Sequence, residues 1–188
     1  NANLSNATLT KANLSYAILS GADLTGADLT NAKLIHADLT NANLSGAKLE
    51  KANASNANLA GVDLSFNNLT EIRLDNANLS DATLTKANLS YAILTGANLS
   101  NANLASTDLS GKNLSNTNLV DAILVEADLS YTILRGADLT GADLTGARLT
   151  YLNSAYGPAI LDGVTWDWAT CPDGTAAYYH GQTCVNNL

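Results

Sequence analysis

A leucine recurs at every fifth position through most of this 188-residue chain, and this spacing restricts the fold more than any other feature. From Leu4 to Leu149 the period holds in 29 of 30 pentads, and Ala54 is the exception. Alanine stands two residues before the leucine position in 23 of these pentads. Asn or Asp usually separates the two apolar positions, Ser or Thr follows the leucine, and a variable residue closes the pentad, as in "ADLTG".

The five-residue period excludes both a continuous helix and a continuous strand. Along an α-helix five residues turn about 500°, which scatters successive leucines around the cylinder. Along a straight strand five steps place successive leucines on opposite faces. A chain that bends once in each pentad keeps alanine and leucine on the same inward side. The fifth position is often Gly or Asn, which tolerate positive φ and so suit the bend. The sequence therefore predicts a solenoid with an apolar interior.

The tandem A(D/N)LxX pattern resembles that of the pentapeptide-repeat proteins over residues 1–152. The resemblance implies an all-β solenoid, namely a right-handed quadrilateral parallel β-helix with four pentads in each coil. Thirty pentads then make about 7–8 coils and, at about 4.8 Å per coil, a rod roughly 36 Å long. Residues 153–188 lack the repeat, and we expect them to form a loop-rich C-terminal capping segment.

The repeat region divides into two related units, residues 1–75 and 76–152. Residues 1–24 recur at residues 76–99 with only three differences, which indicates duplication or fusion. An offset of fifteen pentads is not a whole number of four-pentad coils, so equivalent residues of the two units are expected one face apart. A binding surface on one face of the first unit would therefore not continue on the same face of the second unit. A specific binding site is therefore expected in one unit only.

The capping segment contains both tryptophans, and we expect Trp166 or Trp168 to cover the last leucine layer. Its "TCPDGT" stretch with a later cysteine is similar to the tails of some bacterial, notably cyanobacterial, members of the family. Cys171 and Cys184 fit a disulfide, two buried thiols, or a metal site with His180. A disulfide implies the periplasm, the thylakoid lumen or secretion, whereas reduced thiols imply the cytoplasm. The chain starts within a repeat, which is compatible both with a leader or cap upstream of residue 1 and with its absence.

Charge and composition argue against several classes of function. The net charge of −8 disfavours direct binding to nucleic acid or to an anionic membrane surface. No apolar run of 18 residues exists, so no membrane span is predicted. We predict no cofactor and no enzymatic activity, because His36 and His180 lie far apart and carboxylates such as Asp138 and Asp143 are expected on a convex surface.

At the twenty-residue period that four-pentad coils imply, the two sides of the rod differ in charge. One side carries eight carboxylates, and the candidates for an acidic side are Asp121, Glu126, Asp138 and Asp143. The other side is basic and aromatic, and its interaction candidates are Tyr91, Tyr131, Tyr151, Lys33, Arg73 and Arg135. Tyrosines are the expected anchors, because they supply contact area at a low entropy cost.

Three residues interrupt the repeat, namely Ala54, Asn67 and Lys112. A lysine that faces a dry Leu/Ala core is costly, and the repeat offers it no partner. We therefore expect the corner to open at Lys112, so that its ammonium group reaches water. A similar bulge is expected at Asn67, which follows Phe66, the chain's one phenylalanine. We also expect Lys112→Ala to raise thermal stability.

The sequence favours a non-enzymatic scaffold or protein-interaction module whose partner is unknown. The resemblance implies an alternative, because some family members mimic duplex DNA and inhibit DNA gyrase. A 36 Å duplex presents about 21 phosphate charges, at one per ~1.7 Å, against eight carboxylates on the acidic side. Such mimics are generally dimers joined by a C-terminal helix, whereas this tail is expected to be loop-rich. An exposed N-terminal coil is a further candidate contact for a homodimer.

Overall fold

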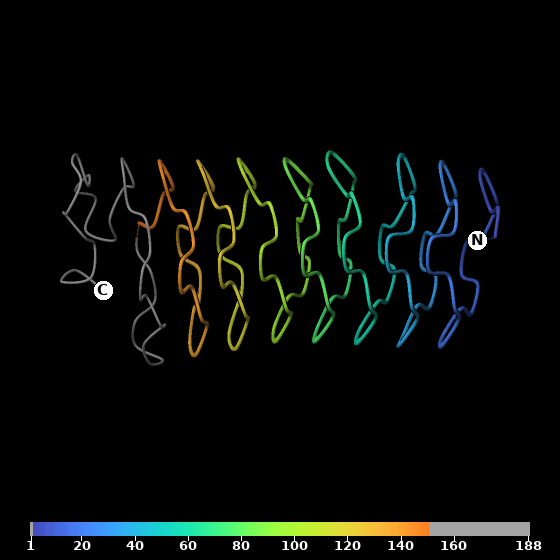
Figure 1. The fold of residues 1–188 in the computed structure, drawn as a ribbon, viewed down its shortest axis with the longest axis horizontal. Coiled ribbons are helices and arrows are strands. Elements are labelled where there is room, and N and C mark those ends of the chain that lie inside the picture. The colour runs from blue at the N-terminus through green and yellow to red at the C-terminus, as the bar shows by residue number, and fades with distance from the viewer. Residues whose placement is uncertain (1, 151–188) are drawn as a thin grey trace.

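The computed structural model describes residues 2–150, which wind into a rod of regular coils (Figure 1). Parallel bridges join residues twenty positions apart, from Asn3↔Asp23 to Asp128↔Arg148. Twenty residues are four pentads, so each coil has four sides, as predicted. The paired residue is always the one between the alanine and leucine positions, and each β segment in the described part of the chain is a single bridge residue.

Each pentad ends in a tight turn at its fifth position. In the first of them, the N–H of Ala7 donates to the carbonyl of Leu4 over 3.0 Å, and φ of Asn6 is 56°. Every fifth position from Asn6 to Gly146 has positive φ. The predicted bend is confirmed, and it explains why Gly and Asn are frequent at this position.

The Asn or Asp that precedes leucine stabilises the same turn. The Oδ1 atom of Asp23 accepts a hydrogen bond from the N–H of Thr25 at 3.0 Å and one from its Oγ1 at 2.6 Å. The equivalent bonds recur along the rod, for instance at Asp38 and Thr40. The order (D/N)-L-(S/T) is therefore a local turn motif that recurs along the rod.

The alanine and leucine side chains form one continuous core. Leucines from Leu24 to Leu149 are almost completely buried, whereas Leu4, Leu9 and Leu14 in the first coil are only partly buried. Ala54, which stands at a leucine position, is also fully buried. The predicted inward direction of both apolar positions is confirmed.

Pairing between coils fails at two neighbouring corners of the described rod. No bridge joins the following pairs: Asn43 and Asp63, Lys48 and Asn68, Asn88 and Asp108, Ile93 and Asn113. The first gap lies beside Asn67 and is visible in Figure 1 as a wider spacing where the ribbon passes from cyan to green. The second gap lies beside Lys112. The two gaps in pairing thus lie beside the two residues where openings were predicted.

Three of the buried polar side chains at the alanine position find acceptors on the preceding coil, whereas Thr117 donates to the carbonyl of Leu114 in its own coil. Asn67, which is 7% exposed, donates through Nδ2 to the carbonyl of Leu44 at 3.1 Å and to that of Ala47 at 3.2 Å. Thr107 and Thr132 donate in the same direction, to the carbonyls of Leu84 and Leu109 respectively. These bonds offset the cost of burying a polar group in the core.

Lys112 behaves differently from these residues, because it is only partly buried. The hydrogen bond from Ser110 lowers the pKa of Asp108, and the charge of Lys112 adds a smaller effect in the same direction, although Lys112 forms no ion pair within 4.0 Å in the described residues. Partial exposure places the ammonium group of Lys112 within reach of water at the edge of the core.

Lys112→Ala is expected to raise the melting temperature by a few degrees, which corresponds to about 1 kcal/mol. Alanine restores the usual residue at this position and allows Ile93 and Asn113 to pair. Thermal unfolding followed by circular dichroism measures the change, and Lys33→Ala on the exposed face is the control. An unchanged or lower melting temperature would contradict the interpretation of Lys112 as a strained interruption.

Candidate interaction surfaces

The four-sided coil places equivalent residues in columns that run along the rod, one residue per coil. Tyr91 and Tyr131 lie in one corner column, two coils apart, and their side chains are 81% and 60% exposed. Lys33 and Arg73 lie on the adjoining face, in a column that continues to Ile93. These candidates of the basic and aromatic side thus occupy adjoining columns of the described rod. Tyr151, the last of its tyrosines, lies outside them.

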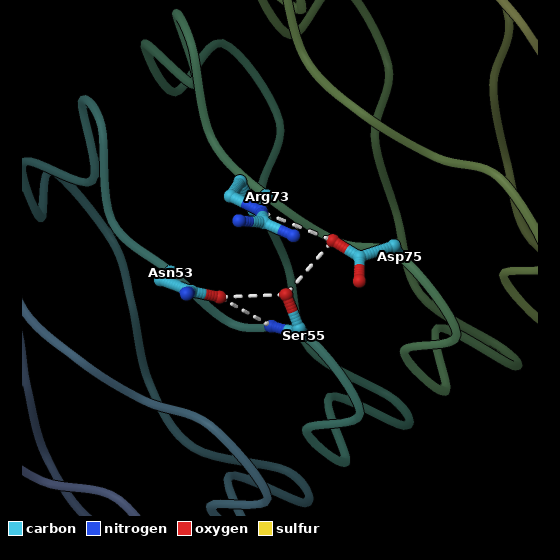
Figure 2. Close-up of polar contacts among 4 residues, drawn as sticks. All are labelled: Asn53, Ser55, Arg73 and Asp75. Atoms are coloured by element: carbon cyan, nitrogen blue, oxygen red, sulfur yellow. Dashed lines mark hydrogen bonds and ion pairs between the residues drawn. The ribbon is translucent and has the colours of Figure 1, made fainter.

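The charge of Arg73 is met by Asp75, a residue of the same coil. Arg73 Nε lies 3.3 Å from Asp75 Oδ1, and that oxygen also accepts from the hydroxyl of Ser55 at 2.8 Å (Figure 2). The Ser55 hydroxyl also lies 2.6 Å from Asn53 Oδ1, so its one proton serves either acceptor. Ser55 is 6% exposed, so the carboxylate of Asp75 contacts a buried hydroxyl on the preceding coil. Arg73 is thus partly neutralised before any partner binds.

Other cations on this side are not neutralised in the same way. Within residues 2–150, ion pairs join Lys48 to Asp28, Lys51 to Glu71, Arg73 to Asp75 and Arg148 to Asp128. Lys33 and Arg135 are exposed and belong to none of these pairs. These two residues carry the available positive charge among the basic candidates.

The carboxylates of the acidic side take part in turns. Asp138 Oδ1 accepts from the N–H and hydroxyl of Thr140, at 2.9 and 2.6 Å, and these bonds lower the pKa of Asp138. Asp143 makes the same pair of bonds with Thr145. Asp121 and Glu126 are exposed at corners. One carboxylate oxygen at Asp138 and Asp143 therefore has a structural role.

A run of asparagines interrupts the acidic side. Between Asp38 and Asp138 the same column holds only Asn58, Asn78, Asn98 and Asn118. Asn78 Nδ2 donates to Asn58 Oδ1 at 2.9 Å, and Asn98 Nδ2 donates to Asn78 Oδ1 at 3.0 Å. The carboxylates of this column are thus separated by an asparagine ladder, which is neutral and hydrogen-bonded from coil to coil.

Each open corner forms a shallow depression with an exposed aromatic residue at its edge. The first has a volume of about 290 Å³ and is lined by Phe66, Asn67 and Glu50 among others. The second has a volume of about 430 Å³ and is lined by Tyr91, Gly111 and Lys112 among others. Phe66 is 74% exposed. Sequence reasoning noted both interruptions but did not connect them with surface depressions.

A second aromatic feature was missed by sequence reasoning. The rings of Tyr16 and His36 stack on adjacent coils, with centroids 5.0 Å apart and planes 15° apart. Both are fifth-position residues with positive φ, one coil apart in the same column. The signal was present in the sequence, because two aromatic residues twenty positions apart must become neighbours in a four-sided coil.

Several other expectations concern features that the described residues test only in part. No group of three or more His, Cys, Asp or Glu side chains within residues 2–150 is placed to hold a metal ion. The same part of the chain contains no helix of the length and hydrophobicity that crossing a bilayer requires. Trp166, Trp168, Cys171, Cys184 and His180 all lie outside the described residues. The alternatives for the cysteines stay predictions, as does the capping role.

The sequence matches the family described as Pentapeptide repeats, in eight copies. The matched segments are residues 2–41, 27–65, 37–75, 68–101, 97–130 and 122–153. No curated protein matches.

Solved structures show the same architecture. HetL, a pentapeptide-repeat protein of the cyanobacterium Nostoc sp. strain PCC 7120 described as involved in heterocyst differentiation regulation, is 33% identical, with a TM-score of 0.67 over 93% of this chain and 89% of HetL. A trypsin-treated variant of QnrB1, a plasmid-mediated fluoroquinolone resistance protein, is 21% identical, with a TM-score of 0.68 over 88% of this chain and 87% of QnrB1. The twenty-residue register, the positive φ of the corner residues and these matches together show that the chain belongs to the pentapeptide-repeat family, with its right-handed quadrilateral β-helix.

Proposed function

We propose that this protein is a non-enzymatic scaffold that binds a partner protein through its basic and aromatic side. The observation that carries the proposal is the clustering of exposed apolar side chains there. Tyr91, Ile93 and Tyr131 are 81%, 43% and 60% exposed and occupy adjoining columns. Exposed tyrosines with apolar neighbours and nearby cations are typical of protein-binding surfaces.

The shape of the described rod supports binding rather than catalysis. Its two corner depressions are shallow and open to solvent, whereas catalysis generally needs a concave site that excludes water. The family consists generally of structural and interaction proteins, and HetL, which is described as involved in the regulation of heterocyst differentiation, also fits a binding role.

DNA mimicry is the alternative, and the acidic side supports it poorly. A mimic of duplex DNA needs closely and regularly spaced negative charges. Here the neutral asparagine ladder from Asn58 to Asn118 separates Asp38 from Asp138. The similarity to QnrB1 at 21% identity concerns the fold alone.

The test compares proteins captured from a cyanobacterial extract by the wild type and by two matched variants. The first variant carries Tyr91→Asn and Tyr131→Asn, because asparagine suits the positive φ of the fifth position. The control carries Ile18→Asn and Ile123→Asn, which remove exposed apolar side chains from the other side. We expect the tyrosine variant alone to lose its specific partners at least tenfold, as measured by quantitative mass spectrometry.

A gyrase supercoiling assay separates the two functions. The variant with Asp138→Asn and Asp143→Asn removes two charges but keeps the Oδ1 acceptors for Thr140 and Thr145. We expect no inhibition by the wild type. Inhibition that the charge variant loses would overturn the scaffold proposal in favour of DNA mimicry.

A further inference from the structure

We infer that the first depression binds the guanidinium group of an arginine side chain on a partner protein, with the carboxylate of Glu50 as its counter-ion. This inference goes beyond the proposed function, because the site is separate from the tyrosines of the basic and aromatic side. The depression lies at the opening where no bridge joins Lys48 to Asn68. Three residues that depart from the repeat line it together, namely Glu50, Phe66 and Asn67.

Glu50 stands where the repeat usually has Ser or Thr, and it brings one more oxygen than the coil uses. At the matching position of the next coil, the Oγ1 atom of Thr70 accepts a hydrogen bond from Nδ2 of Asn88 at 3.1 Å. Glu50 Oε1 takes the same role, because it accepts from Nδ2 of Asn68 at 2.9 Å. Glu50 Oε2 is buried and has no hydrogen-bond partner within residues 2–150. A buried, charged oxygen of this kind is stabilised by a ligand that donates to it.

Backbone groups released by the separation of the coils add further acceptors to the depression. One coil earlier, the carbonyl of Ser45 accepts a hydrogen bond from the N–H of Gly26 at 2.9 Å. The carbonyls of Ser65 and Asn68, which line the depression, accept no hydrogen bond in the described part of the chain. The N–H of Gly46 is likewise unpaired there and stays available to water. The opening thus offers two carbonyl acceptors beside Glu50 Oε2.

Phe66 supplies an exposed aromatic ring at the edge of the same depression. Its side chain is 74% exposed, and its φ of 60° is a conformation that favours Gly or Asn over a residue of this size. The corner itself therefore does not require a phenylalanine. A cation beside Glu50 would gain from contact with the face of this ring.

The charges around the depression leave Glu50 without a counter-ion. Lys48 also lines the depression, but its Nζ atom lies 4.0 Å from Asp28 Oδ2 on the preceding coil, on the side away from the opening. Glu50 belongs to none of the ion pairs among the described residues. The chain's net charge of −8 also favours a positively charged segment of a partner.

Arginine fits this set of groups better than lysine does. A guanidinium group carries five N–H donors in a planar arrangement, so it can donate to Glu50 Oε2 and to a backbone carbonyl while its face contacts Phe66. The ammonium group of lysine is a compact and strongly hydrated charge that does not stack in this way. The combination of a carboxylate, free carbonyls and an exposed ring therefore points to a guanidinium group.

The probe for the test is acetyl-arginine-amide, titrated at constant ionic strength into the ¹⁵N-labelled full chain and followed by NMR. We expect saturable shifts centred on the side-chain amide of Asn68, which donates to Glu50, and on the backbone amide of Phe66. The expected dissociation constant is about 1–10 mM for so small a ligand. Shifts that do not saturate, or that scatter over the rod, would assign Glu50 Oε2 to solvent and overturn the site.

The matched probe is acetyl-citrulline-amide, which has nearly the same shape as the arginine probe but no charge. We expect it to bind at least fivefold more weakly, because it lacks the charge that the carboxylate of Glu50 attracts. Equal affinity of the two probes would overturn the role of Glu50 as the counter-ion.

Glu50→Thr is the decisive variant, since threonine is common at this position of the repeat and keeps an acceptor for Asn68. We expect it to weaken binding of the arginine probe at least tenfold without lowering the melting temperature. Glu126→Gln is the control, because it removes an exposed carboxylate at another corner and is expected to leave binding unchanged. Equal losses in the two variants would indicate general charge attraction and contradict a specific site.

Phe66→Asn tests the aromatic contact separately, and asparagine suits the positive φ of this corner. We expect the arginine probe to bind about threefold more weakly to this variant. Unchanged binding would remove Phe66 from the site and, with it, the preference for a guanidinium group over an ammonium group.

Two further titrations identify the source of the cation. Acetyl-lysine-amide is expected to bind several times more weakly than the arginine probe, and equal binding would overturn the guanidinium assignment. Free arginine is expected to bind no more tightly than the blocked probe, whereas tenfold tighter binding would indicate a small-molecule ligand in place of a partner protein. All of the variants keep Tyr91 and Tyr131, so failure of this site leaves the proposed function unaffected.

Discussion

Replacing Leu99 by alanine is expected to lower the free energy of unfolding by about 2–5 kcal/mol. Leu99 is completely buried, and its column neighbours Leu79 and Leu119 are buried as well. The backbone N–H of Leu99 donates to the carbonyl of Asn118 at 2.7 Å, and this bond between coils limits collapse around the missing methyl groups. The cavity therefore adds to the lost transfer free energy.

Equilibrium unfolding in denaturant measures this change, and Ile123→Ala is its control. Ile123 is 40% exposed, so its truncation is expected to cost less than about 1 kcal/mol. Ala54 already occupies a leucine position in the native rod, so the substitution is expected to preserve the fold. Equal costs for the two variants would show that the leucine columns are not the main source of stability.

Replacing Asn67 by aspartate is expected to lower the free energy of unfolding by about 3–5 kcal/mol at neutral pH. The amide of Asn67 is buried and donates to two backbone carbonyls, those of Leu44 and Ala47. A carboxylate has no proton to donate, so the substitution buries a negative charge against two acceptors. The opening between the two coils then also loses the hydrogen bonds by which Asn67 joins them.

The loss caused by Asn67→Asp depends on pH in a defined direction. Burial and the two carbonyls disfavour the charged form, so the pKa of this aspartate is raised in the folded state. The charge-dependent part of the destabilisation is absent below the unfolded pKa of about 3.9 and reaches its full size as the pH rises through the folded value. Denaturant unfolding at about pH 3 and pH 7 measures it.

Asn103→Asp is the control for this experiment. Its Oδ1 accepts from the N–H of Ala105, and aspartate keeps that bond. We expect a change within about 0.5 kcal/mol and no comparable dependence on pH. A similar loss at neutral pH in both variants would mean that general charge repulsion, and not burial at Asn67, causes the effect.

The candidate surface was only partly predictable from the sequence. The column of Tyr91 and Tyr131 follows from the twenty-residue period once four sides are assumed. The pairing of Arg73 with Asp75 depends on how the Ser55 hydroxyl holds the carboxylate, and this is a matter of side-chain geometry. The open space at Gly111, where an added Cβ atom would meet no atom within 4 Å, depends on which neighbouring side chains cover each corner. The sequence pattern alone does not contain that information.

The sequence by itself determined the period of the coil, the inward alanines and leucines, and the corners with positive φ. These features are local, because each pentad carries its own turn, its own Asn or Asp acceptor in most cases, and its own two apolar residues. Only the tertiary structure decided where neighbouring coils separate and which side chains become available there. Separation at Asn67 and Lys112 is a balance between backbone pairing across coils and the space that two non-alanine residues need. That balance involves residues twenty or more positions apart, so it exists only once the coils have stacked.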